Sequence, residues 1–158
     1  MTQFSWSVEE RERASVRIKV MGDVTEDSDF TALRAECDRD EVILDLAEIH
    51  RINSTGVRGW LFFVSTLGVD NRLVFDRMPN VFVHQNSMVH GFTGQARVRT
   101  ALAPFFCADC DEDQECEIDL ERDIPAQLTV TQKCRSCGGE ATFDGVMTHY
   151  QRLCESGG

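Results

Sequence analysis

The stretch Val42-Ile-Leu-Asp-Leu-Ala-Glu-Ile-His-Arg-Ile-Asn-Ser-Thr-Gly-Val57 decides the fold of the first hundred residues. It opens with an apolar run that holds a single acid, which is typical of a strand buried on both faces of an α/β sheet. A polar turn, Asn53-Ser-Thr-Gly56, then precedes apolar residues at helical spacing as far as Gly68. The sequence therefore predicts a central strand followed directly by a helix whose first turn carries Ser54.

The flanking sequence continues this alternation. Strands are expected at residues 3–8, 14–21, 42–46 and 72–76, and helices after Asp29, Gly56 and Pro79. Residues 97–106 are expected to be extended, and Pro104 argues against a central strand there. Because strands alternate with helices, the fold class predicted for residues 1–103 is a compact α/β layer.

Phe62 and Phe63 lie outside the apolar stripe of the helix after Gly56. This arrangement predicts that something other than the sheet covers part of that helix. The cover could be the C-terminal part of the chain, a second copy in a homodimer, or another protein, and these alternatives stay open.

The distribution of charge divides the chain near residue 100. Residues 1–100 carry 12 Lys/Arg and 15 Asp/Glu, whereas residues 101–158 carry 4 and 12, within a total net charge of −11. We therefore expect two directly joined domains, residues 1–103 and residues 104–158, that pack together. An acidic chain repels phosphate backbones, which argues against nucleic acid as the main partner.

Two Cys-x-x-Cys pairs, Cys107-Ala-Asp-Cys110 and Cys134-Arg-Ser-Cys137, are separated by 23 residues. A two-residue gap lets a tight turn direct two thiolates at one ion, and two such turns complete the tetrahedral four-sulfur site that zinc prefers. Gly138 and Gly139 follow the second pair, where glycine permits a positive φ and its amide can donate to a sulfur. The spacing predicts a structural Zn²⁺ as the cofactor.

Residues 105–143 resemble a zinc ribbon, with strands expected at residues 115–121 and 128–130. The predicted metal ligands are Cys107, Cys110, Cys134 and Cys137, and Cys116, Cys154 or His149 could replace one of them. Four protein ligands leave no position for water or substrate, so the site is expected to be structural rather than catalytic.

Two other interpretations of the cysteine-rich part remain open. One is a ribbon protein associated with nucleic acid or the transcription machinery, although residues 109–123 hold nine acids and one base. The other is a thiol oxidoreductase, which requires a metal-free and reactive cysteine pair.

The segment 42–57 resembles the STAS family, the fold of anti-sigma-factor antagonists, in which a strand ending near Asp-Leu leads to Asp-Ser-Ser/Thr-Gly at the start of a helix. The resemblance extends over residues 3–100 in the order of strands and helices, while only residues 42–68 carry the motif. It implies a mixed sheet with packed helices, and a protein that works by protein–protein contact with a regulatory protein or kinase of the anti-sigma-factor type.

The resemblance also implies that Ser54 is a phosphoacceptor, and Asn53 stands where the family usually has Asp. The partner would dock on the turn and the start of the helix, at residues Asn53, Ser54, Thr55, Gly56 and Arg58. The residues themselves support a negative charge here, because unpaired amides and the helix dipole favour one at a helix N-terminus.

No phosphate-binding loop, dinucleotide fingerprint or nucleophile elbow occurs in the sequence. The resemblance to the STAS family implies instead a non-enzymatic regulator in bacterial signalling. Because the N-terminus has no basic region followed by an apolar stretch and no segment is long enough to span a bilayer, a cytoplasmic location without membrane contact is expected.

Overall fold

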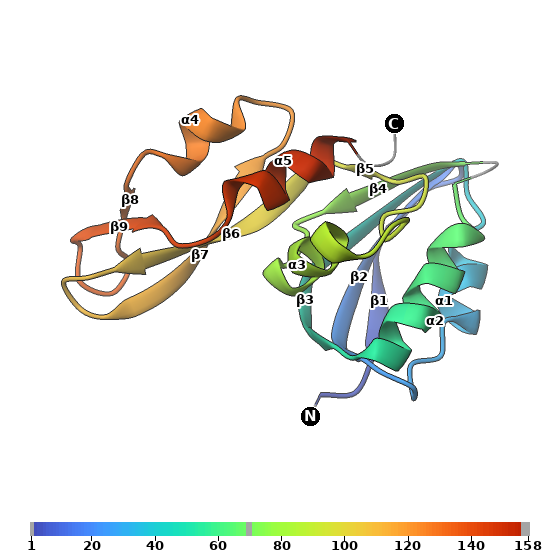
Figure 1. Ribbon diagram of the computed structural model, residues 1–158. Coiled ribbons are helices and arrows are strands. Elements are labelled where there is room, and N and C mark those ends of the chain that lie inside the picture. Colours follow the sequence, from blue (N-terminus) through green and yellow to red (C-terminus); the bar gives the residue numbers. More distant parts are fainter. Residues whose placement is uncertain (1, 69–70, 156–158) are drawn as a thin grey trace.

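The apolar run at residues 42–46 lies in the middle of a five-stranded sheet in the computed structural model, which describes residues 2–68 and 71–155 (Figure 1). The strand order is β1 (Ser5–Arg11), β2 (Ser15–Val24), β3 (Glu41–Ile52), β4 (Arg72–Asp76) and β5 (Arg97–Val98). β1 is antiparallel to β2 and the other pairs are parallel, so the sheet is mixed. The mixed α/β class expected from the sequence is confirmed.

Helices α1 (Thr31–Glu36), α2 (Ser54–Ser65) and α3 (Asn80–Met88) follow three of these strands, and α2 and α3 lie in front of the sheet in Figure 1. Trp60 of α2 is buried at the centre of this layer. Its ring centroid lies 4.8 Å from that of Phe82 and 5.6 Å from that of Phe75, and its Nε1 donates to the Phe92 carbonyl at 2.8 Å. No helix in the described ranges is both long and apolar enough to cross a membrane.

The two phenylalanines outside the apolar stripe of α2 have different environments. Phe63 is buried and stacks on Phe30, with ring centroids 4.9 Å apart. The sequence just before α1 therefore covers Phe63, and the prediction that another domain or partner covers it is wrong. Phe62 is 75 % exposed.

The chain then forms a second, four-stranded antiparallel sheet, in the order β7 (Glu112–Asp119), β6 (Thr100–Cys107), β9 (Glu140–Phe143) and β8 (Gln132–Lys133). Pro104 lies within β6, a central strand, so the prediction that it excludes one there is wrong. The ladder tolerates this proline because it sits where the β6–β9 pairing ends, and its carbonyl still accepts a 2.9 Å bond from the Asp144 amide.

The strand predicted at residues 128–130 is also wrong. Leu128 ends a short helix, α4 (Ile124–Leu128), whose first turn is capped by the Asp123 carboxylate on the Ala126 amide at 3.0 Å. Pro125 at the start of that helix favours it further. The helix-start residues Asp123 and Pro125 therefore outweigh the alternation of apolar and polar residues at 128–130.

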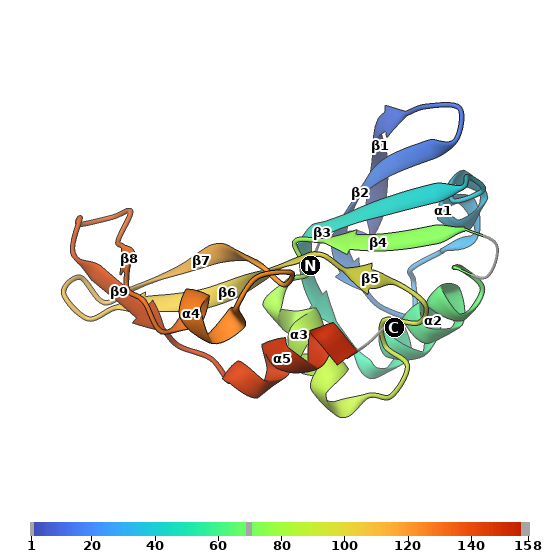
Figure 2. The same cartoon turned by 90° about the horizontal axis from the view of Figure 1, so that it is seen from above.

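The last helix, α5 (Met147–Glu155), joins the two sheets by packing along α3 (Figure 2). Tyr150 of α5 is buried, and Arg152 donates through Nη1 to the Ser87 carbonyl of α3 at 2.9 Å. The expectation that the two parts of the chain pack together is confirmed. The four-stranded sheet begins at Thr100, directly after β5.

Candidate functional site

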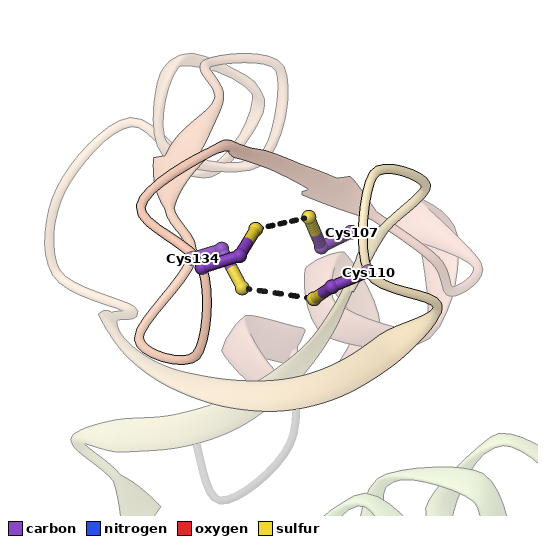
Figure 3. A group of neighbouring side chains, drawn as sticks. Cys107, Cys110 and Cys134 are labelled. Atoms are coloured by element: carbon purple, nitrogen blue, oxygen red, sulfur yellow. Dashed lines mark hydrogen bonds between the residues drawn. The ribbon is translucent and has the colours of Figure 1, made fainter.

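The four predicted ligands come together at the far end of the second sheet. Cys107 ends β6 and Cys110 lies in the turn to β7, while Cys134 and Cys137 lie in the turn between β8 and β9. The four Sγ atoms are all within 4.8 Å of one another. Figure 3 shows thiols from the two turns pointing toward each other, with Sγ–Sγ distances of 3.6 Å for Cys107–Cys137 and for Cys110–Cys134.

These distances fit a bound metal ion. Thiolates at about 2.3 Å from a tetrahedral zinc are separated from one another by about 3.8 Å. The observed 3.6 Å is close to that edge and well above the roughly 2.05 Å of a disulfide. The arrangement is therefore compatible with one metal ion held by four sulfurs, and not with two covalent bridges.

The two turns repeat the same backbone geometry. Gly138 follows the second pair with φ 77°, and Asp111 follows the first pair with φ 60°. The Gly138 amide donates to the Cys134 carbonyl and the Asp111 amide to the Cys107 carbonyl, each at 2.9 Å. The left-handed position at Gly138 is as predicted. The left-handed conformation of Asp111 is not predicted from the sequence, because an aspartate adopts that conformation only where its surroundings favour it.

Backbone amides direct positive charge at the sulfurs of the second turn. The amides of Cys137 and Ser136 lower the pKa of the Cys134 thiol to about 6. The Gly139 amide lies 3.4 Å from the Cys137 Sγ, as the sequence predicts for a glycine after the pair. Burial and contact with Cys134 raise the pKa of the Cys110 thiol to about 12.

The proposed substitute ligands lie outside this cluster. Cys116 Sγ contacts the Gln114 side-chain amide at 3.6 Å, and Cys154 Sγ donates to the Leu120 carbonyl at 3.4 Å. The His149 ring lies beside that of His84, with centroids 6.1 Å apart. Over residues 2–68 and 71–155, the group of possible ligands contains only the four cysteines of the two pairs.

The second candidate site is the turn that begins α2. Asn53 is the N-cap, and its Oδ1 accepts a 2.7 Å hydrogen bond from the Gly56 amide. Its Nδ2 donates to Glu26 at 2.8 Å, which lowers the pKa of the Glu26 carboxyl. Ser54 and Thr55 are exposed beside this pair. The sequence gives no sign of Glu26, because the contact joins positions 27 residues apart.

Gly56 allows the first turn of α2 to lie close against the first sheet. A Cβ on Gly56 would lie 2.1 Å from the Val24 carbonyl oxygen, so the first turn of α2 rests directly on the end of β2. Arg58, in the first turns of α2, is exposed. The structure thus places Asn53, Ser54, Thr55 and Arg58 on the surface and Gly56 beneath them.

An apolar groove of about 480 Å³ runs between α1 and α2. It is lined by Phe30, Thr31, Arg34, Ala35, Gly59, Phe62, Phe63 and Thr66. Arg34 is held at its rim, where Nε donates to the Thr66 hydroxyl at 2.9 Å. The helical pattern identifies Phe62 as an outlier, but the groove depends on the tertiary placement of α1 and is not predictable from it.

Comparison with known proteins finds no family model that matches the chain and no curated protein with significant similarity to it.

Proposed function

We propose that this protein is a non-enzymatic regulator of the STAS type, which acts by protein–protein contact in bacterial signalling and carries a structural Zn²⁺ in a zinc ribbon. The observation that carries the proposal is the outer side of α2. It presents Ser54, Thr55 and Arg58 in its first turns and an exposed Phe62 beside an apolar groove. The order of strands and helices in the first sheet supports the resemblance to anti-sigma-factor antagonists.

The chemistry of this surface defines the partner. A phenylalanine that is 75 % exposed next to an apolar groove is a typical anchor for an interface. Arg34 lines the groove and Arg58 is exposed on α2, four positions before Phe62. Residues 54–66 contain no acid, although the chain has a net charge of −11. The partner is therefore a protein, of the anti-sigma-factor or kinase type, that inserts an apolar side chain between acidic groups.

Zinc would stabilise the second sheet rather than perform chemistry. The four-sulfur cluster uses only protein ligands, so it leaves no open coordination position for a substrate. The strands on either side of the second cysteine pair are short, with two residues in β8 and four in β9. A metal ion supplies the folding free energy that so small a core lacks.

Nucleic acid fits this protein poorly as an alternative partner. β7, next to the cysteine cluster, exposes Glu112, Asp113, Glu115 and Glu117. These carboxylates would repel a phosphate backbone.

The proposal is tested by affinity purification from the native cell with three forms of the chain: the parent, Phe62→Ser and Met88→Ser. Met88 is the matched control, because it is also a large exposed apolar side chain, at the end of α3. We expect the parent and Met88→Ser to recover the same stoichiometric protein partner and Phe62→Ser to lose it. Equal recovery by all three forms, or recovery of nucleic acid instead, would contradict the proposal.

A further inference from the structure

Gln114 of β7 joins that strand to the backbone around Cys134 through its side-chain amide. Its Nε2 donates to the Lys133 carbonyl at 3.1 Å, and its Oε1 accepts from the Arg135 amide at 3.0 Å. Lys133 and Arg135 are the immediate neighbours of Cys134. One side chain therefore fixes the backbone on both sides of a single predicted ligand, in the way that a neighbouring strand would.

A second contact returns from the turn to the same strand. Arg135 Nη2 donates to the Glu115 carbonyl at 2.8 Å. Since β7 follows Cys110 and pairs with β6 up to Cys107, both contacts tie the second turn to the strands that carry the first pair. Cys134 is thereby held between two backbone groups that are tied to β7.

We propose that Gln114 is a positioning residue of the metal centre, which sets the place of Cys134 and thereby the affinity for zinc. This inference rests on the proposed zinc site. Groups that orient a ligand without touching the metal commonly change metal affinity by about 10–100-fold when they are removed. Gln114 is half-buried and uses both its donor and its acceptor, so its loss leaves two backbone groups without that partner.

Gln127 offers a matched control within the same sheet unit. It is also a half-buried glutamine with a double backbone contact: its Oε1 accepts from the Asp119 amide at 2.8 Å and its Nε2 donates to the Asp119 carbonyl at 2.7 Å. This contact joins α4 to β7 and involves no residue adjacent to a cysteine of the cluster. A change that merely weakens the sheet would affect both variants alike.

The experiment measures the dissociation constant for Zn²⁺ by competition with a chromophoric chelator, on the full chain, for the parent, Gln114→Ala and Gln127→Ala. We expect Gln114→Ala to bind Zn²⁺ about tenfold or more weakly and Gln127→Ala to match the parent. Substitution by Co²⁺ gives a second readout, because the absorption spectrum of a cobalt–thiolate centre reports its geometry. That spectrum should change for Gln114→Ala only.

Each other outcome has a definite meaning. If the parent binds no zinc, the proposed metal site itself fails. If the parent binds zinc and Gln114→Ala binds it equally, or if both glutamine variants lose affinity to the same extent, the positioning role is wrong. Should Gln114→Ala not fold, Gln114→Glu serves instead, because it keeps the acceptor for Arg135 and loses the donor to Lys133. Its affinity should then fall below that of Gln127→Glu, and equal affinities would overturn the inference.

Discussion

The Tyr150 hydroxyl donates a 2.9 Å hydrogen bond to the Leu102 carbonyl, and thereby fixes the last helix onto the strand that leads into the cysteine cluster. The same hydroxyl lies 3.3 Å from Asn80 Oδ1 at the start of α3. The side chain is almost fully buried, and burial raises the pKa of its phenol, so it stays neutral at ordinary pH. Tyr150 is therefore a link between the two sheets.

Replacing Tyr150 by phenylalanine should destabilise the whole chain while leaving its shape intact. The change removes the hydroxyl and leaves the Leu102 carbonyl without its partner, at a cost of about 1–2 kcal/mol. Urea unfolding measures this cost, with Thr148→Ala, at an exposed position of the same helix, as the control. A Tyr150→Phe protein as stable as the parent would show that the hydroxyl does not stabilise the contact between α5 and β6.

Gly56→Ala should destabilise the first sheet and the turn that carries Ser54. Its new Cβ would meet the Val24 carbonyl at 2.1 Å, and backbone cannot yield as a side chain can. We expect a loss of about 1–3 kcal/mol or more from such overpacking. Thermal unfolding of Gly59→Ala provides the comparison, because there the nearest atom is the end of the Phe30 ring at 3.2 Å. The idea fails if both variants unfold at the same temperature.

The stability of the chain should fall in acid through Asp76. This carboxylate accepts hydrogen bonds from Arg17 at 2.8 Å and from Arg99. Burial opposes its ionisation, but these guanidinium groups outweigh burial and lower the pKa of Asp76 below its ordinary value. A lowered pKa means that its contribution is complete above the unfolded pKa, about 3.9, and is lost as the pH falls through the folded pKa.

Denaturant titrations across the range from about pH 6 to pH 2 measure this dependence for the parent and for Asp76→Asn. The variant should be less stable near pH 6, because it leaves two half-buried arginines without the ionised acceptor that Asp76 provides. Its stability should also fall less steeply below pH 4. If the free energy of unfolding falls equally steeply with pH in the two proteins, Asp76 is not the cause of the loss of stability in acid.

A negative charge at Ser54 should alter partner binding without unfolding the protein. Ser54→Asp places the charge in the first turn of a 12-residue helix, where the dipole favours it, although Glu26 lies close by. Ser54→Ala should bind the partner as the parent does, and Thr148→Asp, exposed on α5 away from the proposed docking surface, is the charge control. If Ser54→Asp binds the partner as the parent does, or if Thr148→Asp loses it to the same extent, the turn is not a switch.

Local signals in the sequence predict the four-cysteine cluster and the start of α2. Two residues between paired cysteines fix a turn, and an N-cap side chain acts on an amide three positions away. Such features depend on residues that are close in the sequence, so they can be predicted without a structure. The cluster of Cys107, Cys110, Cys134 and Cys137 belongs to this class, and so does the start of the helix at Ser54.

The contacts that escaped prediction join distant positions. The sequence separation is 27 residues for Asn53 and Glu26, 21 for Gln114 and Arg135, and 48 for Tyr150 and Leu102. The hydrophobic periodicity of a sequence carries no information about such pairs. The prediction that Pro104 excludes a central strand is wrong for the same reason. Whether a proline fits such a strand depends on where the pairing with the neighbouring strand ends, and the sequence does not show this.

The zinc content of the chain, purified without chelator, tests the central claim most directly. One equivalent of zinc per chain is predicted, together with loss of the second sheet when the metal is removed, because four thiolates at this spacing need an ion to hold them together. Less than about half an equivalent, with the four thiols free to react and the fold unchanged by chelator, would contradict the account.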